Sequence, residues 1–518
     1  MMTITPADMK ALETRFMADH GVPGALLMEH AAMGVVDAIA RYTNNGTALF
    51  LCGTGNNGGD GYAAARLWQT LGGKAHIVEV TDSAHGDALL NRHLAQMLCI
   101  PIERYAAEDS LPDCDVIVDA LFGTGLSRAI DGTAAVLIHR ANDRHRDCGT
   151  PIIAVDIPSG IDGTTGHVLG QEAICATETV TFHRIKQGLL LSDGPDHAGK
   201  LTVQPILIPE GDELDLAYDG LEILAPAELD SERFRRCATA HKGDFGRIVL
   251  FCGSRGMAGA AALCANAAMR TGAGLTTILC RESLLPILQT LAPGAMCAPL
   301  PERDGVLLPQ AVDIARAALS HADAACIGCG LGQAPDLLPL LTLFTQADCP
   351  VVWDADALNL LSRHAELLPL KKADIITPHP GEAARLLGCT TAEVTEDMLS
   401  ALHRLHGRCG CTVLLKGART LITDGENRFC NLYTSPALAK GGSGDVLSGI
   451  ITALLGRRFR HWGNLHGARA AAYGALIHGL SGIRAAQRHG ESCTLPTDLV
   501  DCIRLDSQGI DWYKEVPG

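Results

Sequence analysis

The sequence has few aromatic residues and no excess of positive charge. Aromatic side chains make up 4% of the 518 residues, and 58 Asp and Glu outnumber 42 Lys and Arg, which gives a formal net charge of −16. The chain has few aromatic rings that could stack on nucleic-acid bases. Its acidic charge balance argues against a nucleic acid or an anionic membrane as a partner bound through overall charge. We therefore expect no nucleic-acid partner and no membrane partner, although local loops can still bind a nucleotide.

Targeting and membrane-spanning segments are not expected either. Residues 1–10 lack a basic start followed by an apolar stretch, so we expect no signal peptide. No uninterrupted apolar run reaches the length that crosses a bilayer. The 19 cysteines follow no disulfide framework, which predicts reduced, buried thiols in a cytoplasmic protein. Cys326 and Cys329 form a CxxC pair with no second pair nearby in the sequence, so packing is favoured over metal or redox chemistry.

Glycine and apolar residues, in contrast, are plentiful and follow an α/β pattern. The chain has 56 glycines and is 47% apolar, and it is too long for one ordinary core. Helical periodicity covers residues 6–40. Buried strands are predicted over 48–52, 75–80, 116–120 and 152–156, and in the second half over 247–252, 324–328, 351–354, 375–377 and 413–416. Strands that alternate with helices predict a parallel sheet in each half, with loops at its carboxyl edge. Acidic, aperiodic residues 210–230 are interpreted as a linker between domains 1–215 and 225–518.

Three motifs follow strands in the first half. They are NNGGDG at 56–61, DALFGTGL at 119–126 and DIPSG at 156–160. Oxygens of Asn57, Asp119 and Ser159 suit a hard cation, and the amides of 123–126 suit a phosphate. Asp156 is then left as a candidate acid or base. The alternative is three ordinary βα turns, because Asp and Asn tolerate turn geometry, but three motifs in this order favour a site.

The most informative motif in the second half is AKGGSGDVLSG at 439–449. Unpaired amides at a helix start form an anion site, and glycines let the backbone approach a phosphate. Asp445 would repel that phosphate, so we interpret it as a base that takes a proton from the attacking group in phosphoryl transfer. The alternative is a glycine-rich loop with Asp445 as a helix-start residue.

Further strand-end residues accompany this motif. The segments HKGDFG at 241–246, GS at 253–254, TPHPGE at 377–382 and LKG at 415–417 follow in order. His379 between two prolines has a purely structural turn role as its alternative, and Lys416 has a solvated one. Asp354 is predicted to be a strand-end carboxylate near the site, and Asp356 to be a helix N-cap.

Together these motifs resemble two known families. The first set resembles the NAD(P)H-hydrate epimerase (YjeF N-terminal) family over residues 10–210. The second resembles the NAD(P)H-hydrate dehydratases, a branch of the ribokinase-like superfamily, over 235–505. The resemblance implies a Rossmann-like three-layer domain followed by a ribokinase-like α/β domain. One departure is Cys329, where that family usually has proline in a Gly-Pro-Gly-Leu-Gly turn.

For the first half, the resemblance implies interconversion of R and S hydrates at C6 of the nicotinamide ring, assisted by Asp156. It implies that Asn57, Asp119 and Ser159 hold K⁺. The implied hydrate-binding residues are Asn56, Asn57, Gly58, Gly59, Asp60, Gly123, Thr124, Gly125, Leu126, Ser127, Arg128, Ala129 and Asp156.

For the second half, the resemblance implies dehydration of the S hydrate with ADP as the phosphoryl donor, releasing AMP and phosphate. Asp445 is the implied catalytic base, Mg²⁺ is expected, and Glu382 is a candidate to organise it. The implied hydrate-binding residues are Gly259, Ala260, Gly332, His379 and Asp445. The implied nucleotide-binding residues are Lys416, Gly417, Ala418, Arg419, Thr420, Gly442, Ser443 and Gly444.

Two other functions fit parts of the sequence. The first is a ribokinase-like small-molecule kinase with a regulatory N-terminal half, because the Asp445 loop serves both chemistries. The second is an N-terminal half that only binds a partner, against which the presence of Asn57, Asp119, Asp156 and Ser159 argues. The favoured interpretation is a bifunctional isomerase and lyase that repairs hydrated NADH and NADPH, and we expect it to be a homo-oligomer.

Overall fold

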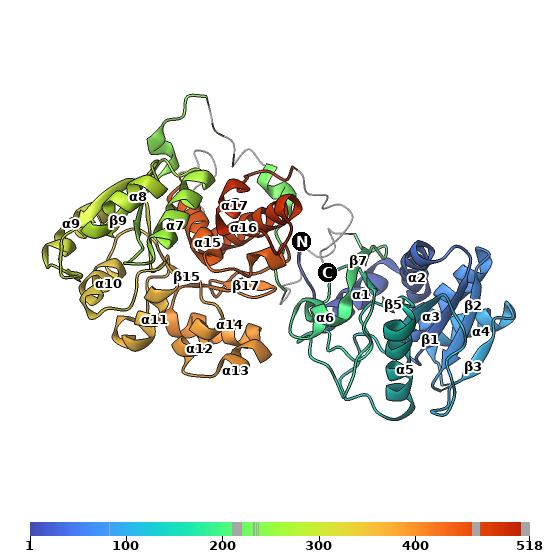
Figure 1. The fold of residues 1–518 in the computed structure, drawn as a ribbon. Helices are drawn as coiled ribbons and strands as arrows, with labels where there is room; N and C mark the ends of the chain where they lie inside the picture. The colour runs from blue at the N-terminus through green and yellow to red at the C-terminus, as the bar shows by residue number, and fades with distance from the viewer. Residues whose placement is uncertain are drawn as a thin grey trace. The chain divides into compact units, whose positions relative to one another are not determined.

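The chain folds into two compact units (Figure 1). The computed structural model describes residues 1–81, 83–209, 220–230, 234, 236, 238–457 and 467–508. Met2–Leu221 belong to one unit, whereas Met1 and residues 222–508 belong to the other. The boundary lies within the predicted linker, of which residues 210–219 are outside the described residues.

The N-terminal unit is built on a parallel sheet of seven strands in the order β3-β2-β1-β4-β5-β6-β7. Apolar strands that are buried on both faces explain the parallel arrangement, since helices must cover both sides. The order reverses between β1 and β4, where an open α/β sheet leaves a crevice for ligands. The strands are β1 Thr47–Cys52, β2 Lys74–Glu79, β3 Ile102–Arg104, β4 Val116–Ala120, β5 Ile152–Val155, β6 Glu178–Phe182 and β7 Lys200–Gln204.

The helical stretch predicted over 6–40 consists of two helices. Gly21 adopts the left-handed conformation that ends α1, and Pro23 stands directly before α2. Glycine and proline at these positions stop one helix and start the next, which periodicity alone does not register. The helices of this unit are α1 Pro6–His20, α2 Gly24–Tyr42, α3 Asn56–Thr70, α4 Gly86–Met97, α5 Gly132–Cys148 and α6 Gly194–Ala198.

The C-terminal unit has a mixed sheet of nine strands in the order β10-β9-β8-β13-β14-β15-β16-β17-β18. Strands β8–β10 and β13–β16 are parallel, and β17 and β18 continue the sheet as antiparallel strands. The order reverses between β8 and β13, so this unit has its own crevice position. The strands are β8 Arg247–Phe251, β9 Leu275–Arg281, β10 Met296–Leu300, β13 Ala324–Ile327, β14 Val351–Trp353, β15 Ile375–Ile376, β16 Thr412–Leu415, β17 Thr420–Thr423 and β18 Arg428–Asn431, with β11 Glu302–Arg303 and β12 Val306–Leu307 as a separate pair.

Helices α7, α15 and α16 contribute most of the helical residues in the core on one face of this sheet. Helix α15 begins at Ser443, directly after the glycine-rich turn, and eleven of its residues after Asp445 are buried. No helix among the described residues is long and apolar enough to cross a membrane. The helices are α7 Ala258–Thr271, α8 Leu285–Leu291, α9 Gln310–Leu319, α10 Leu338–Thr345, α11 Asp356–Arg363, α12 Pro380–Leu387, α13 Thr391–Glu396, α14 Met398–Cys409, α15 Ser443–Gly456, α16 Gly467–His489 and α17 Pro496–Asp501.

Candidate active sites

The start of α3 lies at the switch point of the N-terminal sheet. Helix α3 begins at Asn56, and no side chain caps its first amides. Asn56 is exposed, whereas Gly58 and Gly59 are buried. A Cβ on Gly58 would lie 2.0 Å from the carbonyl oxygen of Gly53, and one on Gly59 would lie 2.6 Å from Met28. These two glycines are therefore needed for close packing of the helix, in addition to any role toward a phosphate.

Two of the predicted cation ligands, Asp119 of β4 and Ser159 after β5, are in direct contact. Asp119 is fully buried and accepts hydrogen bonds from Ser159, through its amide at 2.7 Å and its hydroxyl at 2.6 Å. Burial raises the pKa of Asp119 to about 6, although these hydrogen bonds favour the charged form. The buried side-chain nitrogen of Asn57 has no hydrogen-bond partner among the described residues. A half-turn of this amide exchanges its nitrogen and oxygen, so the group suits a cation that needs one more oxygen ligand.

The predicted phosphate loop at 123–129 is an irregular segment between β4 and α5. Gly125, Ser127, Arg128 and Ala129 are exposed, and the Leu126 amide closes a turn by donating to the Gly123 carbonyl at 3.1 Å. Since this loop follows β4, it stands next to the start of α3 at the same sheet edge. A Cβ on Gly123 would lie 2.9 Å from the Asn57 side chain, which brings the two motifs into direct contact.

Asp156 is held by a buried lysine that the motifs do not contain. The ammonium of Lys186 donates to Asp156 Oδ1 at 2.5 Å and to the Phe182 carbonyl at 2.8 Å. Asp156 Oδ1 also accepts from the Phe182 amide at 3.0 Å and from the Thr181 hydroxyl at 3.3 Å. The Lys186 side chain is 1% exposed and that of Asp156 is 12% exposed. Asp156 has a φ of +64°, in the left-handed region that residues other than glycine rarely adopt.

Two further carboxyl groups, those of Glu13 and Asp60, interact electrostatically with this pair. Burial raises the pKa of Glu13, on α1, to about 7, and it raises the pKa of Asp60 well above its usual range. Lys186 opposes both shifts, while the charge of Asp156 adds to both. Sequence reasoning included Asp60 and Asp156 but missed Glu13 and Lys186. A lysine in the mostly apolar segment after β6 was the available signal, because buried lysines are rare unless they are paired.

In the C-terminal unit, Lys416 and Asp354 form a pair at the carboxyl edge of β16 and β14. The Lys416 ammonium donates to Asp354 Oδ1 at 2.9 Å, and the Ser448 hydroxyl of α15 donates to Asp354 Oδ2 at 2.7 Å. Burial raises the pKa of Asp354 despite the opposing effect of Lys416. A Cβ on Gly444 would lie 3.5 Å from the Lys416 ammonium, so the glycine-rich turn faces the pair directly. Lys416 is therefore ion-paired and is not a solvated charge. Asp354 lies at the end of its strand near the site, as predicted.

Asp445 lies in the first turn of α15 beside this pair. The helix is preceded by Gly442 in the left-handed conformation, and in the described part of the chain no side chain caps its amides. Burial, with smaller contributions from Cys329 and Asp354, raises the pKa of Asp445 to about 9. Ser443 points elsewhere, because its hydroxyl lies 3.0 Å from Nε2 of the buried His478 on α16. A helix start with open amides, a lysine and a carboxyl of raised pKa is an arrangement suited to phosphoryl transfer.

His379 and Glu382 form a reciprocal cap at the start of α12. The Gly381 amide donates to His379 Nδ1 at 3.0 Å, and the His379 amide donates to Glu382 Oε2 at 2.9 Å. The cap accounts for the turn role considered for His379, and it leaves half of the imidazole exposed. Glu382 is buried with one oxygen 3.9 Å from the Lys416 ammonium, so its carboxylate belongs to the same site.

The remaining predicted hydrate residues lie near the β8 and β13 turns. Gly259 and Ala260 are in the first turn of α7, and a Cβ on Gly330 would touch Ala260 at 2.8 Å. The Gly332 amide donates to Asp356 Oδ2 at 2.8 Å. The prediction that Asp356 caps α11 is wrong: Ala355 takes the cap position, and Asp356 instead fixes the turn after β13. The hydrogen bond from the Gly332 amide is therefore formed in place of the local cap that an Asp side chain often provides.

The predicted nucleotide segment 416–420 links β16 to β17. Gly417 and Ala418 are accessible, whereas the Arg419 side chain is buried and donates to the Leu432 carbonyl at 3.0 Å. Burial lowers the pKa of Arg419. Within segment 416–420, the Lys416 side chain contacts Asp354.

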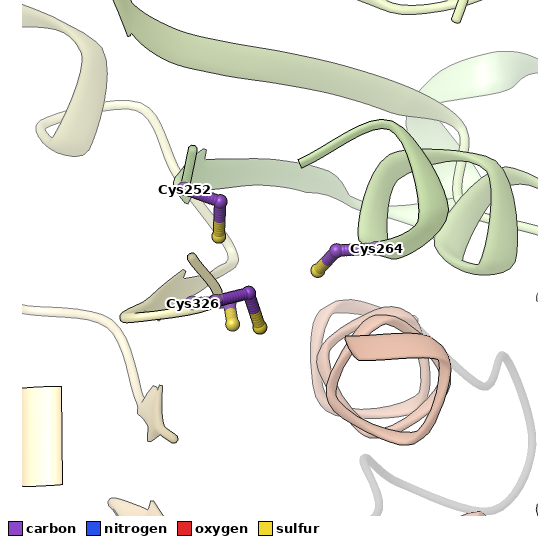
Figure 2. Close-up of side chains that lie close together, drawn as sticks. Cys252, Cys264 and Cys326 are labelled. Carbon is purple, nitrogen blue, oxygen red and sulfur yellow. The ribbon is translucent and has the colours of Figure 1, made fainter. Parts of the chain in front are cut away.

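The CxxC pair also has a different environment from the one its sequence suggests. Cys252 and Cys264 lie beside Cys326 and Cys329, and all four are buried (Figure 2). The sequence interpretation rested on the lack of a second pair, and the fold supplies two more cysteines, one directly after β8 and one from α7.

Both halves match known families. Residues 24–188 match the YjeF-related protein N-terminus, and residues 248–505 match the NAD(P)H-hydrate dehydratase family. The chain is 36% identical over 519 residues to a bifunctional NAD(P)H-hydrate repair enzyme of Moorella thermoacetica, with 97% of this chain and 96% of that protein covered. The same enzyme of Escherichia coli is 37% identical over 472 residues, covering 88% of this chain and 84% of that protein.

A solved structure is also similar to the C-terminal half. The ADP/ATP-dependent NAD(P)H-hydrate dehydratase of Bacillus subtilis, co-crystallised with ATP and Mg²⁺, is 29% identical with a TM-score of 0.45, covering 52% of this chain and 91% of that chain. Since the curated relatives align over nearly the whole length and both halves match their own family, the chain belongs to the bifunctional NAD(P)H-hydrate repair enzymes.

Proposed function

We propose that this chain restores damaged nicotinamide nucleotides in two steps. The N-terminal half interconverts the R and S hydrates of NADH and NADPH, and the C-terminal half dehydrates the S hydrate with ADP. The products are NAD(P)H, AMP and phosphate. A dehydratase that accepts one epimer leaves the other behind, so an epimerase in the same chain makes chemical sense. The observation that carries the proposal is Asp445, a carboxyl of raised pKa at an open helix start beside Lys416.

In the C-terminal half, Asp445 takes the proton from the C6 hydroxyl as that oxygen attacks the terminal phosphorus of ADP. The bond between this phosphorus and the bridging oxygen breaks, and AMP leaves. The amides of 442–444 and the Lys416 ammonium stabilise the charge on the transferred group. Loss of phosphate then breaks the C6–O bond while C5 gives up a proton, which restores the ring double bond. A raised pKa makes Asp445 a stronger base than an ordinary carboxylate once it is ionised.

Glu382 and Asp354 are the residues that would hold Mg²⁺ in this site. Glu382 and Asp354 supply carboxylate oxygens of the kind that this ion prefers, either directly or through water. When bound, the ion offsets negative charge on the phosphates. Lys416 contacts Asp354 and approaches Glu382, so it keeps these two carboxylates compatible with each other and with an anionic substrate.

In the N-terminal half, Asp156 is the proposed acid or base at C6. Lys186, Thr181 and the Phe182 amide all bind Oδ1, and no hydrogen bond to Oδ2 occurs among the described residues. This arrangement fixes the carboxyl and leaves one oxygen for the substrate. We assign Lys186 as a positioning residue, because it acts through Asp156.

K⁺ fits the neighbouring set of Asn57, Asp119 and Ser159. Asp119 offers a buried carboxylate, Ser159 a hydroxyl, and Asn57 an amide whose buried end is unsatisfied. When bound, the ion would offset the negative charge of Asp119. Asn56, Gly58, Asp60 and the loop 123–129 then surround the hydrate.

The experiment that tests the function offers separated R and S hydrates of NADH, with ADP and ATP in parallel, and follows the absorbance of the regenerated dihydronicotinamide. Both hydrates should be recovered, and ADP should support turnover. A stable phosphorylated product without recovery of NADH would support the kinase alternative. Asp156→Ala should abolish turnover of the R hydrate and leave the S hydrate unaffected. The homo-oligomer stays a prediction that light scattering can test.

A further inference from the structure

Four cysteines meet inside the C-terminal unit, at the point where the strand order of its sheet reverses. Cys252 follows β8, Cys326 is in β13, Cys329 is in the turn after β13, and Cys264 is in α7. All four side chains are fully buried, and their sulfurs lie within 4.8 Å of one another. Figure 2 shows the sulfurs of the labelled residues converging from the strands and the helix.

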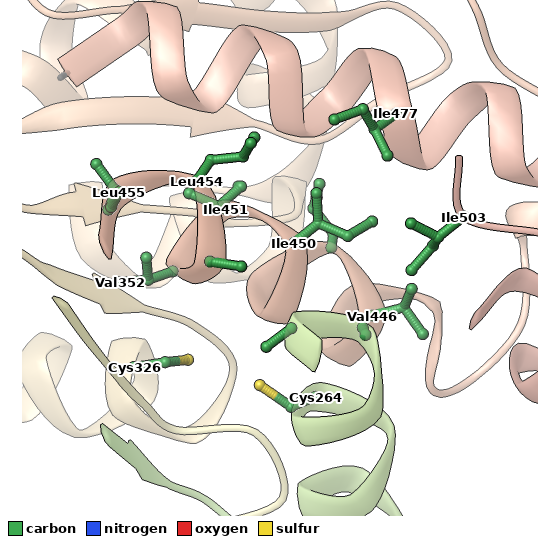
Figure 3. Close-up of a cluster of buried hydrophobic side chains, with 14 of the residues drawn as sticks. Cys264, Cys326, Val352, Val446, Ile450, Ile451, Leu454, Leu455, Ile477 and Ile503 are labelled. Atoms are coloured by element: carbon green, nitrogen blue, oxygen red, sulfur yellow. The ribbon is translucent and has the colours of Figure 1, made fainter. Parts of the chain in front are cut away.

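The register explains why the fold brings them together. Cys326 pairs with Leu250 in β8, so Cys252, two residues further on, lies on the same face of the sheet. Helix α7 covers this face and presents Cys264 to it, and α15 packs beside α7 (Figure 3). The turn after β13 brings Cys329 back, where its carbonyl accepts from the Gly253 amide at 2.8 Å.

The spacing of the sulfurs suits one metal ion. Four thiolates around a tetrahedral ion with metal–sulfur bonds of about 2.3 Å are separated by about 3.8 Å. Sulfurs that already lie within 4.8 Å need to move by only about 1 Å to reach this geometry. Among the described residues, this is the one group of three or more metal-binding side chains that comes so close together.

Hydrophobic packing alone gives no reason for four sulfurs at one point. The other buried cysteines of this unit, such as Cys411 and Cys430, are not part of any such group among the described residues. A small apolar residue fills such positions equally well, whereas soft thiolates in a tetrahedral set select Zn²⁺ or Fe²⁺.

We propose that Cys252, Cys264, Cys326 and Cys329 bind one divalent transition-metal ion, Zn²⁺ or Fe²⁺, as a structural site. Binding replaces the four thiol protons, which are released to solvent, and forms four metal–sulfur bonds without any change in oxidation state. The site then carries a net charge of −2. The Lys416 ammonium interacts electrostatically with Cys329 and offsets part of this charge, whereas the carboxyl groups of Asp445 and Asp354 also interact with Cys329 and oppose it.

The consequence for the dehydratase half is mechanical. The ion joins the end of β8, the middle of β13, helix α7 and the turn that leads to Gly332. This turn also contacts the start of α7 at Ala260 and is held by Asp356. The ion therefore fixes the backbone beneath the proposed hydrate subsite. Because all four ligands are buried, the ion is expected to enter during folding and to resist chelators while the unit stays folded.

The test uses the full-length protein and two kinds of measurement. The protein is produced with Zn²⁺ present, and its metal content is measured after dialysis against a chelator, where we expect about one ion per chain. Refolding with Co²⁺ under reducing conditions should give the visible absorption of tetrahedral cobalt with thiolate ligands. Almost no bound ion together with no such cobalt spectrum would overturn the proposal, as would a disulfide among the four cysteines by mass spectrometry.

Two matched variants separate a metal site from packing. Cys264→Ala removes one ligand from α7, whereas Cys430→Ala removes a buried thiol from β18 that is outside the cluster. We expect Cys264→Ala to lose the ion and the cobalt spectrum, and Cys430→Ala to keep both. Equal metal content in Cys264→Ala and wild type would overturn the proposal, and the cobalt measurement on wild type stands if the variant fails to fold.

Discussion

Replacing Lys186 with methionine tests how the N-terminal site holds its acid or base. The change keeps the length and apolar stem of the side chain but removes the only cation that contacts Asp156 among the described residues. Both side chains are almost fully enclosed, so water screens the pair very little. Breaking a buried ion pair from one side costs about 3–5 kcal/mol, because the remaining charge is left without compensation. Lys186 also lowers the pKa of Glu13 and of Asp60, so removing it should raise both pKa values further.

The loss should appear as local destabilisation of the N-terminal unit. Hydrogen exchange of amides in β5 and β6 measures this free energy in the full-length chain, with amides of β13 as an internal control. Adding Asp156→Asn to Lys186→Met should recover most of the loss, since neither charge then remains. Epimerisation of the R hydrate should be lost in Lys186→Met, while dehydration of the S hydrate should persist.

Three results would refute this reasoning. Stability of Lys186→Met within about 1 kcal/mol of wild type would mean that the pair is well solvated. A double variant no more stable than Lys186→Met would mean that packing of the lysine stem, and not its charge, sets the cost. Wild-type epimerase activity in Lys186→Met would remove its role in positioning Asp156.

The remaining predictions concern catalysis, pH and backbone packing. Asp445→Asn should lower the rate of dehydration by about 10²- to 10⁴-fold with little change in ADP affinity, measured by single-turnover kinetics and calorimetry; a rate within threefold of wild type would exclude it as the base. Burial raises the pKa of Glu13 from its ordinary 4.5 to about 7, so ionisation of this carboxyl destabilises the folded N-terminal unit. The destabilisation is absent below about pH 4.5 and complete above about pH 7. Glu13→Gln should therefore flatten the decline in stability over this range, by about 3 kcal/mol in urea unfolding, and an unchanged slope would contradict the assignment. Gly58→Ala should destabilise the N-terminal unit because its Cβ would lie 2.0 Å from a backbone oxygen, whereas Gly125→Ala meets nothing within 4 Å and should keep wild-type thermal stability.

The two-part α/β architecture could be predicted because it depends on local patterns. Alternating strands and helices determine parallel sheets, and parallel sheets gather their strand-end loops at one edge. The contact of Ser159 with Asp119, the approach of Asn57 to Gly123, and the meeting of Lys416 with Asp354 and Gly444 follow from that rule. The identity of the chemistry came from motifs whose residues are adjacent in sequence.

The sequence by itself thus determined the fold class, both halves of the function and most side chains at the two sheet edges. Only the tertiary structure decided which groups from distant segments join them. Lys186 reaches Asp156 because β6 lies beside β5, and Asp356 leaves its helix cap for the turn of Gly332. Cys252 and Cys264 join Cys326 and Cys329 through strand register and helix packing. The physical reason is the same in all three cases. A buried charge, carboxylate or thiol needs a partner close to it in space, and the sequence does not show which distant residue that partner is.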